Sequence, residues 1–228
     1  MSLPPSEIPQ GAIRFNTDSQ RLEFYAQGEW WVMSTDTPNL GQDSDSTPGA
    51  RGLFAGGYAS AAASPKTTSN IDYVNIASTG NAVSFGSLSS GADQDIVPVG
   101  ASRTRGVFRD GNSTSMTYVT FASTGNSVSF GTALTSNNRA NGLSNETRGI
   151  HGGGNDAASK VNIDYITIAS TGNAVDFGTM TGAHSPGTGA SPTRGIFAGC
   201  AAHPASGGNT IEFITISTLG NAQDFGDL

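Results

Sequence analysis

The chain has 228 residues, of which 31 are glycine and only 13% are charged, and its formal net charge is −7. So little charge with so much glycine argues against a helical protein, and acidity without a visible basic patch argues against a nucleic-acid partner. The single cysteine, Cys200, excludes a disulfide within the chain.

The first predicted element is a three-stranded meander between residues 11 and 33. Apolar and polar residues alternate in three short runs, which are separated by turn residues at 16–18 and 27–28. The alternating apolar positions are Ile13, Phe15, Leu22, Phe24, Trp30 and Val32. Three short strands bury too little apolar surface to be stable alone. We therefore expect this module, residues 1–35, to pack on a partner, a sister copy or the rest of the chain.

Residues 36–50 form a connector rich in Ser, Thr, Asp and Pro. The run Asp43-Ser44-Asp45 within it could bind calcium, but acidic residues are common in solvated linkers. We therefore expect no metal in this segment.

Four repeats follow. They are marked by a Gly-Asn pair at spacings of 45, 47 and 48 residues, and by an Arg-Gly pair at spacings of 54, 43 and 46 residues. Repeats of about 40–50 residues are typical of β-propeller blades. The sequence therefore divides into units at 51–104, 105–147, 148–193 and 194–228. The marker residues are Gly80, Gly125, Gly172 and Gly220, with Arg51, Arg105, Arg148 and Arg194.

Each repeat contains three predicted strands. The first is "RGLFAGG" and its copies, a short strand that ends in glycines. The second, "IDYVNIAS", is apolar on both faces, as a sheet packed between two others requires. The third, "AVSFG", carries a constant aromatic residue at Phe85, Phe130, Phe177 and Phe225.

A tight hairpin is predicted between the second and third strands, at Thr-Gly-Asn, because Gly and Asn tolerate positive φ. This gives the recurring asparagines a structural rather than a binding role. They are Asn81, Asn126, Asn173 and Asn221.

A variable stretch follows each of the first three Phe-Gly pairs and predicts an irregular fourth strand or a long loop. The stretch before the first repeat resembles the one before the fourth, so we expect residues 39–50 to complete the last blade. An open array would leave sheet edges bare, which proteins avoid. The prediction is therefore an all-β chain: a three-stranded β-meander followed by a closed, four-bladed β-propeller.

No catalytic or metal-binding motif is recognisable. His151 replaces a repeat aromatic and is expected to be a packed ring, whereas His184 and His203 lie in variable segments as solvated loop residues. None has a ligand partner at the third or fourth following position. We expect no enzyme, no metal and no cofactor.

Acidic residues recur at one repeat position, which favours an architectural role such as pairing with the repeated arginines. They are Asp72, Asp164 and Glu212.

The beginning of the chain lacks the basic and apolar regions of a secretory signal, and no stretch reaches the roughly 18 apolar residues of a membrane span. We expect a soluble protein made in a cytoplasm.

The repeats resemble those of kelch propellers, in which a Gly-Gly pair ends one strand. Gly56-Gly57 and Gly152-Gly153-Gly154 match this pattern, whereas Asp110-Gly111 and Gly199-Cys200 depart from it by one residue each. The tryptophan that is usual in the third strand of that family appears here as phenylalanine. The resemblance implies a kelch-like architecture and transfers no function.

The front module resembles a short module of tail-fibre, collar and baseplate proteins of tailed bacteriophages. The matching residues are Gly11, Phe15, Asn16, Thr17, Leu22, Glu23, Tyr25 and Trp30. The repeats also look like those of structural proteins of marine and cyanobacterial phages.

The phage resemblance implies a structural virion protein, a homotrimer or higher, that contacts other virion proteins through its front module and the host surface through its propeller. The implied attachment residues are Phe15, Asn16, Thr17, Leu22, Phe24, Tyr25, Trp30 and Trp31.

Two other functions stay open. One is a lectin-like head that binds a surface glycan, with candidate residues Tyr58, Asn137, Asn138 and His184 in variable segments. The other is a polysaccharide depolymerase, which needs two carboxylates roughly 5–10 Å apart in a cleft. The sequence shows no privileged pair of this kind.

Overall fold

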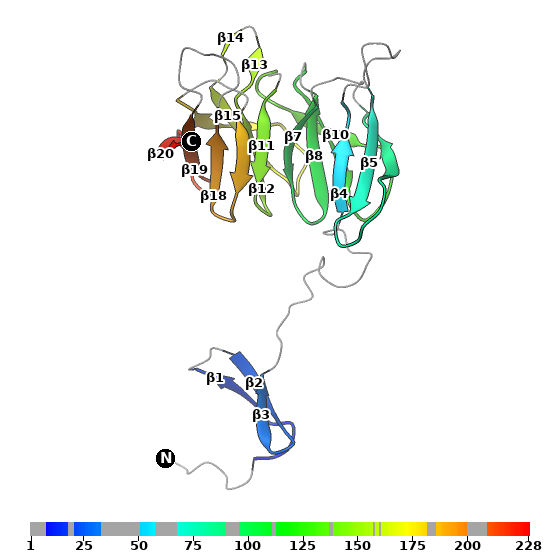
Figure 1. The fold of residues 1–228 in the computed structure, drawn as a ribbon, viewed down its shortest axis with the longest axis vertical. Coiled ribbons are helices and arrows are strands. Elements are labelled where there is room, and N and C mark those ends of the chain that lie inside the picture. The colour runs from blue at the N-terminus through cyan, green and yellow to red at the C-terminus, as the bar shows by residue number, and fades with distance from the viewer. Residues whose placement is uncertain are drawn as a thin grey trace. The chain divides into compact units, whose positions relative to one another are not determined.

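The computed structural model describes residues 8–17, 21–32, 51–57, 68–89, 96–110, 113–136, 139–156, 158–159, 161–181, 186–199 and 209–228. These residues form strands and turns without a helix, which confirms the predicted all-β class. Among them there is consequently no helix of the length and apolarity that crossing a membrane would take. The chain divides into two compact units, Met1–Asn39 and Leu40–Leu228 (Figure 1).

The first unit contains the N-terminal sheet, an antiparallel meander in the order β1-β2-β3. Its strands are β1 (Ile13–Asn16), β2 (Arg21–Ala26) and β3 (Glu29–Val32). The second turn consists of Gln27 and Gly28, whose φ angles of 55° and 87° fit the two-residue turns that match the twist of a hairpin. The predicted meander and its turn at 27–28 are therefore present in the structure.

The second unit contains four antiparallel sheets that follow one another along the chain. Sheet 1 consists of β4 (Arg51–Ala55), β5 (Asn70–Asn75) and β6 (Val83–Ser87), and sheet 2 of β7 (Ile96–Ala101), β8 (Arg105–Asp110), β9 (Ser115–Thr120) and β10 (Val128–Thr132). Sheet 3 consists of β11 (Asn141–Ser144), β12 (Arg148–Gly152), β15 (Asn162–Thr167) and β16 (Val175–Thr179), and sheet 4 of β17 (Gly187–Ala190), β18 (Arg194–Ala198), β19 (Thr210–Thr215) and β20 (Gln223–Asp227). A short ribbon of β13 (Asn155–Asp156) and β14 (Ala158–Ser159) extends from sheet 3.

The variable stretches supply the first strand of sheets 2, 3 and 4, namely β7, β11 and β17. Of the two alternatives predicted for these stretches, the fourth strand is therefore confirmed in sheets 2, 3 and 4, each of which begins before its Arg-Gly pair. Sheet 4 already has four strands between residues 187 and 227. The segment 39–50, predicted to complete that sheet, lies outside the described residues.

Three apolar clusters lie between the four sheets, one at each junction. The first joins Ile71 and Phe85 of sheet 1 to Phe108 and Val119 of sheet 2, and equivalent clusters lie between sheets 2 and 3 and between sheets 3 and 4. This explains why the second strand of each repeat is apolar on both faces: each inner sheet contributes to two clusters. Each sheet therefore has an upstream face toward the preceding sheet and a downstream face toward the following one.

Backbone hydrogen bonds also join consecutive sheets. Gly125 N donates to Phe85 O at 2.8 Å, and Asn126 Oδ1 accepts from Ser87 N at 3.0 Å. The same pair of bonds recurs at the next two junctions, through Gly172 with Asn173 and through Gly220 with Asn221. The predicted tight hairpin at Thr-Gly-Asn is wrong, because this segment runs along the outer strand of the preceding sheet. In sheets 2 to 4 the recurring asparagine accepts a hydrogen bond from the preceding sheet, and it does not have positive φ.

The closed ring predicted from the sequence is not confirmed. The inter-sheet hydrogen bonds between described residues join consecutive sheets, and Figure 1 shows the β4–β5 end and the β18–β20 end at opposite sides of the row of sheets. Phe225 of sheet 4 is 53% exposed, whereas its equivalents in sheets 1 to 3 are 3% exposed. Among the described residues, no sheet packs on the Phe225 face of sheet 4, and Phe54 and Ile76 on the outer face of sheet 1 are also more than half exposed.

Candidate functional site

One face of the N-terminal sheet is organised around a buried carboxylate. Glu23 is 6% exposed and accepts hydrogen bonds from Asn16 Nδ2 at 2.9 Å and Arg14 Nε at 2.8 Å. These two bonds hold the pKa of the Glu23 carboxyl below its ordinary value. The Arg14 guanidinium lies 4.1 Å from the ring centre of Trp30, which packs edge-on against Tyr25. This polar and aromatic cluster fixes the sheet from one side.

The opposite face of the same sheet is apolar and uncovered. The strand register places five apolar side chains on it, because directly paired residues share a face. They are Ile13, Phe15, Leu22, Phe24 and Trp31, each between 36% and 64% exposed. Contiguous exposed apolar surface of this kind on a small sheet marks an interaction site. We define these five residues as the apolar face.

The structure divides the eight predicted attachment residues between the two faces. Phe15, Leu22, Phe24 and Trp31 lie on the apolar face. Asn16, Tyr25 and Trp30 lie on the opposite face, in the Glu23 cluster, and Thr17 lies in the exposed turn after β1. Ile13 completes the apolar face. The sequence match did not include Ile13, although its alternation with Phe15 is visible in the sequence.

The repeated arginines lie over the aromatic ring of their own sheet. Arg51, Arg105 and Arg148 lie 4.6 to 4.9 Å from the ring centres of Tyr73, Tyr118 and Tyr165, and Arg194 lies 4.8 Å from that of Phe213. Each of these rings in turn packs edge-on against the constant phenylalanine of the repeat. An Arg–aromatic–Phe stack therefore recurs on the downstream face of every sheet.

The first three arginines also bind the following sheet. Arg148 Nη1 donates to Ile216 O at 2.7 Å, and Arg51 Nη1 makes the equivalent bond to Phe121 O. Arg105 Nη1 donates to the equivalent Ile168 O at 3.3 Å and to the neighbouring Ala169 O at 2.8 Å. The expected pairing of the repeated arginines with the recurring acids is wrong, because the ion pairs among the described residues are Arg14–Glu23 and Arg103–Glu146.

Two of the three recurring acids, Asp164 and Glu212, instead bind the segment that follows the preceding sheet. Asp164 Oδ2 accepts from Leu134 N at 3.2 Å, and Glu212 Oε1 accepts from Thr181 N at 2.9 Å. Both carboxylates are less than 7% exposed. Their role is architectural, as predicted, but they act between sheets.

A cluster of buried ionisable groups lies only between sheets 2 and 3 in the described part of the repeats. Arg109 of β8 is 1% exposed, and His151 of β12 and Asp164 of β15 are 4% and 3% exposed. Arg109 replaces an alanine or glycine of the other repeats, and His151 replaces a phenylalanine. His151 is a packed ring, as predicted, and its Nδ1 lies 3.3 Å from the carbonyl oxygen of Asp164. Sequence reasoning missed Arg109, although its departure from the repeat was the available signal.

Burial shifts all three pKa values toward the neutral forms. It raises the pKa of Asp164 to about 6 and lowers that of His151 to about 4, with the Arg109 charge lowering the latter further. Burial also lowers the pKa of Arg109 to about 10, so it stays charged at neutral pH. At neutral pH the cluster therefore contains the charged Arg109 beside His151 and Asp164, whose pKa values are both shifted from their ordinary ranges.

We predict that the contribution of His151 and Asp164 to the free energy of unfolding does not change between about pH 4 and 6, and that replacing either residue makes it change. Between about pH 4 and 6, folded His151 is neutral while unfolded histidine is protonated, so the contribution of His151 to stability increases as the pH rises. In the same range, folded Asp164 is protonated while unfolded aspartate is ionised, so the contribution of Asp164 to stability decreases as the pH rises. In the native protein these two contributions cancel.

In the His151→Phe variant only the contribution of Asp164 remains, and the free energy of unfolding should fall as the pH rises from about 4 to about 6, by up to about 1.4 kcal/mol per pH unit. In the Asp164→Asn variant only the contribution of His151 remains, and the free energy of unfolding should rise over the same pH range. Urea unfolding at a series of pH values measures both slopes. Parallel profiles for the native protein and the two variants would contradict the assigned shifts.

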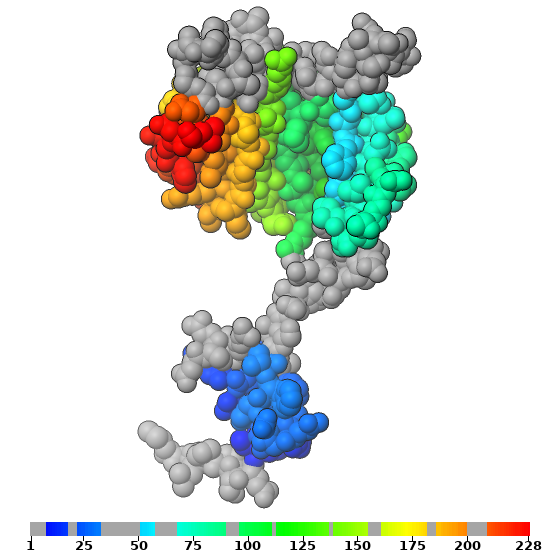
Figure 2. All heavy atoms as spheres, in the orientation of Figure 1, coloured from blue at the N-terminus to red at the C-terminus, as the bar shows by residue number. Residues whose placement is uncertain are grey.

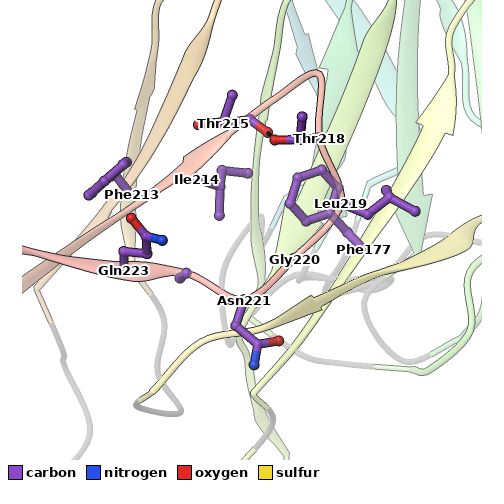
Figure 3. A pocket seen from close by; sticks show the side chains of 10 residues that line it. Phe177, Phe213, Ile214, Thr215, Thr218, Leu219, Gly220, Asn221 and Gln223 are labelled. Carbon is purple, nitrogen blue, oxygen red and sulfur yellow. Dashed lines mark hydrogen bonds between the residues drawn. The ribbon is translucent and has the colours of Figure 1, made fainter.

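Two hollows recur at equivalent places in different repeats. One of about 300 Å³ lies inside the β19–β20 loop, lined by Phe177, Thr218, Leu219 and Asn221 among others (Figure 3). Another of about 150 Å³ lies in the equivalent loop of sheet 2, beside Phe85 and Gly125. Because the hollow recurs with the loop, it follows from the repeat and does not mark a single ligand site.

Several predicted positions lie outside the described residues. They are Asp43, Asp45, Tyr58, Asn137, Asn138, His184, Cys200 and His203. Within the described part of the chain, no group of three or more His, Cys, Asp or Glu side chains is arranged to hold a metal ion.

Comparison with known proteins adds no relative: the chain matches no protein-family model, and a search of curated proteins finds no match.

Proposed function

We propose that this chain is a non-enzymatic structural component of a bacteriophage virion, held in a tail, neck or baseplate appendage by the apolar face of its N-terminal sheet. The observation that carries the proposal is the contrast between the two faces of that sheet. One face is fixed by the Glu23 cluster, and the other leaves Phe15 and Trp31 at least half exposed. The Glu23 cluster orders one face of the small sheet, and the other face has apolar surface to bury on another virion protein.

The repeat unit supports a presenting role in this proposal. Its four sheets pack face to face through apolar clusters, and their first strands β7, β11 and β17 come from the variable stretches. We propose that the sheets are blades of a kelch-like propeller that is open in the single chain. Several copies on one appendage would add weak contacts to the host surface or to neighbouring virion proteins.

Incorporation into particles tests the docking part of the proposal. The double variant Phe15→Ser, Trp31→Ser removes two exposed aromatic side chains and leaves the Glu23 cluster untouched. Burying each such side chain contributes about 1.5–3 kcal/mol, and each 1.4 kcal/mol corresponds to about tenfold in affinity. We expect the number of copies per purified particle, measured by quantitative mass spectrometry, to fall at least about tenfold.

The matched control is Val175→Ser, which changes an exposed apolar residue of the repeat unit. This variant should be incorporated at the native level. Absence of the native chain from purified particles, or equal incorporation of the double variant and the control, would refute the proposal.

A further inference from the structure

The repeat unit has an exposed face on its first sheet and another on its last sheet. The downstream face of sheet 4 carries the residues that sheets 1 to 3 use to bind their following neighbours, and the upstream face of sheet 1 carries those that sheets 2 to 4 use to bind their preceding neighbours. Figure 2 shows the first sheet in cyan and the last in orange to red at opposite sides of the repeat unit. The three internal junctions therefore show what each uncovered face is built to contact.

The downstream face of sheet 4 has the apolar residues of a junction without their cover. Leu228, three residues after Phe225, is 75% exposed, whereas the residues at this position in sheets 1 to 3 are 5% to 6% exposed. Arg194 lies over Phe213 like the other three arginines over their rings, and it is exposed. Gly226 has no atom within 4 Å of an added Cβ, whereas the equivalent Gly131 would meet a backbone oxygen of the next sheet at 2.1 Å.

The upstream face of sheet 1 lacks cover in the matching positions. Ile76 is 69% exposed, whereas the residues at this position in sheets 2 to 4 are at most 7% exposed. Phe54 is 62% exposed, and its equivalents Phe108 and Phe197 are buried. The Gly80–Asn81 segment is exposed, although Gly and Asn at these positions bind the preceding sheet at all three internal junctions.

We propose that the downstream face of sheet 4 in one copy of this chain binds the upstream face of sheet 1 in a second copy, forming a fourth junction of the same design as the three within the chain. Arg194 would donate to the carbonyl of Ile76. Gly80 N would donate to Phe225 O, and Asn81 Oδ1 would accept from Asp227 N. The contact joins different surfaces of identical chains, so the assembly is head-to-tail and either closes into a ring or continues.

The occupant is a second copy because the complementary residues belong to this chain, and the two faces of one chain lie at opposite sides of the unit. The inference is independent of the N-terminal sheet: it concerns the repeats alone and holds whatever the apolar face binds.

Two single substitutions, each on one face, test the contact. Ile76→Lys and Phe225→Glu both change side chains that are more than half exposed in the single chain, so neither should impair folding. In sedimentation velocity at increasing protein concentration, the native chain should form species of two or more copies. Each variant alone should remain a monomer, and the circular dichroism spectra should show that both are folded.

Mixing the two variants gives the sharpest result. The Phe225→Glu copy retains an intact upstream face, and the Ile76→Lys copy retains an intact downstream face, so the mixture should form a pair through one native contact. The double variant should stay monomeric, and the control Val175→Lys should associate like the native chain. A native chain that remains monomeric at all concentrations would overturn the proposal, as would a mixture that fails to pair while the native chain associates.

Discussion

Replacing Phe130 by alanine should lower the free energy of unfolding by about 3–5 kcal/mol. Phe130 is 3% exposed, packs edge-on against Tyr118 at 5.9 Å, and belongs to the apolar cluster between sheets 2 and 3. Its removal leaves a cavity enclosed by sheets 2 and 3. The lost free energy therefore includes contacts within sheet 2 and contacts across the junction with sheet 3. Urea unfolding followed by far-ultraviolet circular dichroism measures the change.

The matched control is Phe225→Ala, at the same position of the last repeat. Phe225 makes the same edge-on contact, with Phe213, at 6.0 Å, but it is 53% exposed because no sheet of the described residues packs on it. At concentrations where the chain is monomeric, the control should cost about 1 kcal/mol. Equal losses for the two variants would mean that stability resides within single sheets and not at their junctions.

The second large effect is expected for Gly131→Ala. An added Cβ would lie 2.1 Å from Gly172 O, on the segment through which sheet 3 binds sheet 2. Sheet 3 must move away, which strains the Gly172 N to Phe130 O and Ala174 N to Thr132 O bonds at 2.9 and 2.8 Å. Overpacking costs about 1–3 kcal/mol and each weakened bond about 0.5–1.5 kcal/mol. We expect a total loss of about 3 kcal/mol in urea unfolding.

The control Gly226→Ala separates the clash of a new Cβ with the next sheet from the cost of placing a side chain at positive φ. Gly131 and Gly226 both have positive φ, at 158° and 142°, so the conformational penalty of a side chain enters both variants. Of these two glycines, only Gly131 lies against a neighbouring sheet. The difference between the two losses, about 2 kcal/mol, therefore measures the junction. A difference near zero would contradict the explanation of the recurring Phe-Gly pair as a site of close approach.

Much of the local structure could be predicted because it depends on periodicity. The alternation of Ile13 and Phe15 with polar residues predicts a strand wherever the chain is placed, and so does the β-branched second strand of each repeat. The variable stretches were harder, since strands such as β17 (Gly187–Ala190) consist of small residues without an apolar pattern. Their strand conformation depends on pairing with β18 and not on local preference.

The roles of the repeated polar residues could not be predicted. Arg148 and Asp164 share a repeat and have opposite charges, yet one binds the following sheet and the other the preceding sheet. A one-dimensional pattern does not show which face of a sheet a residue occupies relative to its neighbours. Arg109 is a different case, because the sequence shows that it replaces the alanine or glycine of the other repeats. Only the structure shows that it lies near His151, which replaces a phenylalanine of the other repeats.

The sequence by itself determined that the chain is all-β, that four similar units follow a three-stranded meander, and that each unit needs a neighbour on both faces. These properties follow from side-chain periodicity, which is local. Only the tertiary structure decided that Gly-Asn joins consecutive sheets, that the arginines bind carbonyls of the next sheet, and that the first and last sheets keep open faces. Those properties depend on distances between residues about 40 or more positions apart, and such distances arise only when one sheet packs on another.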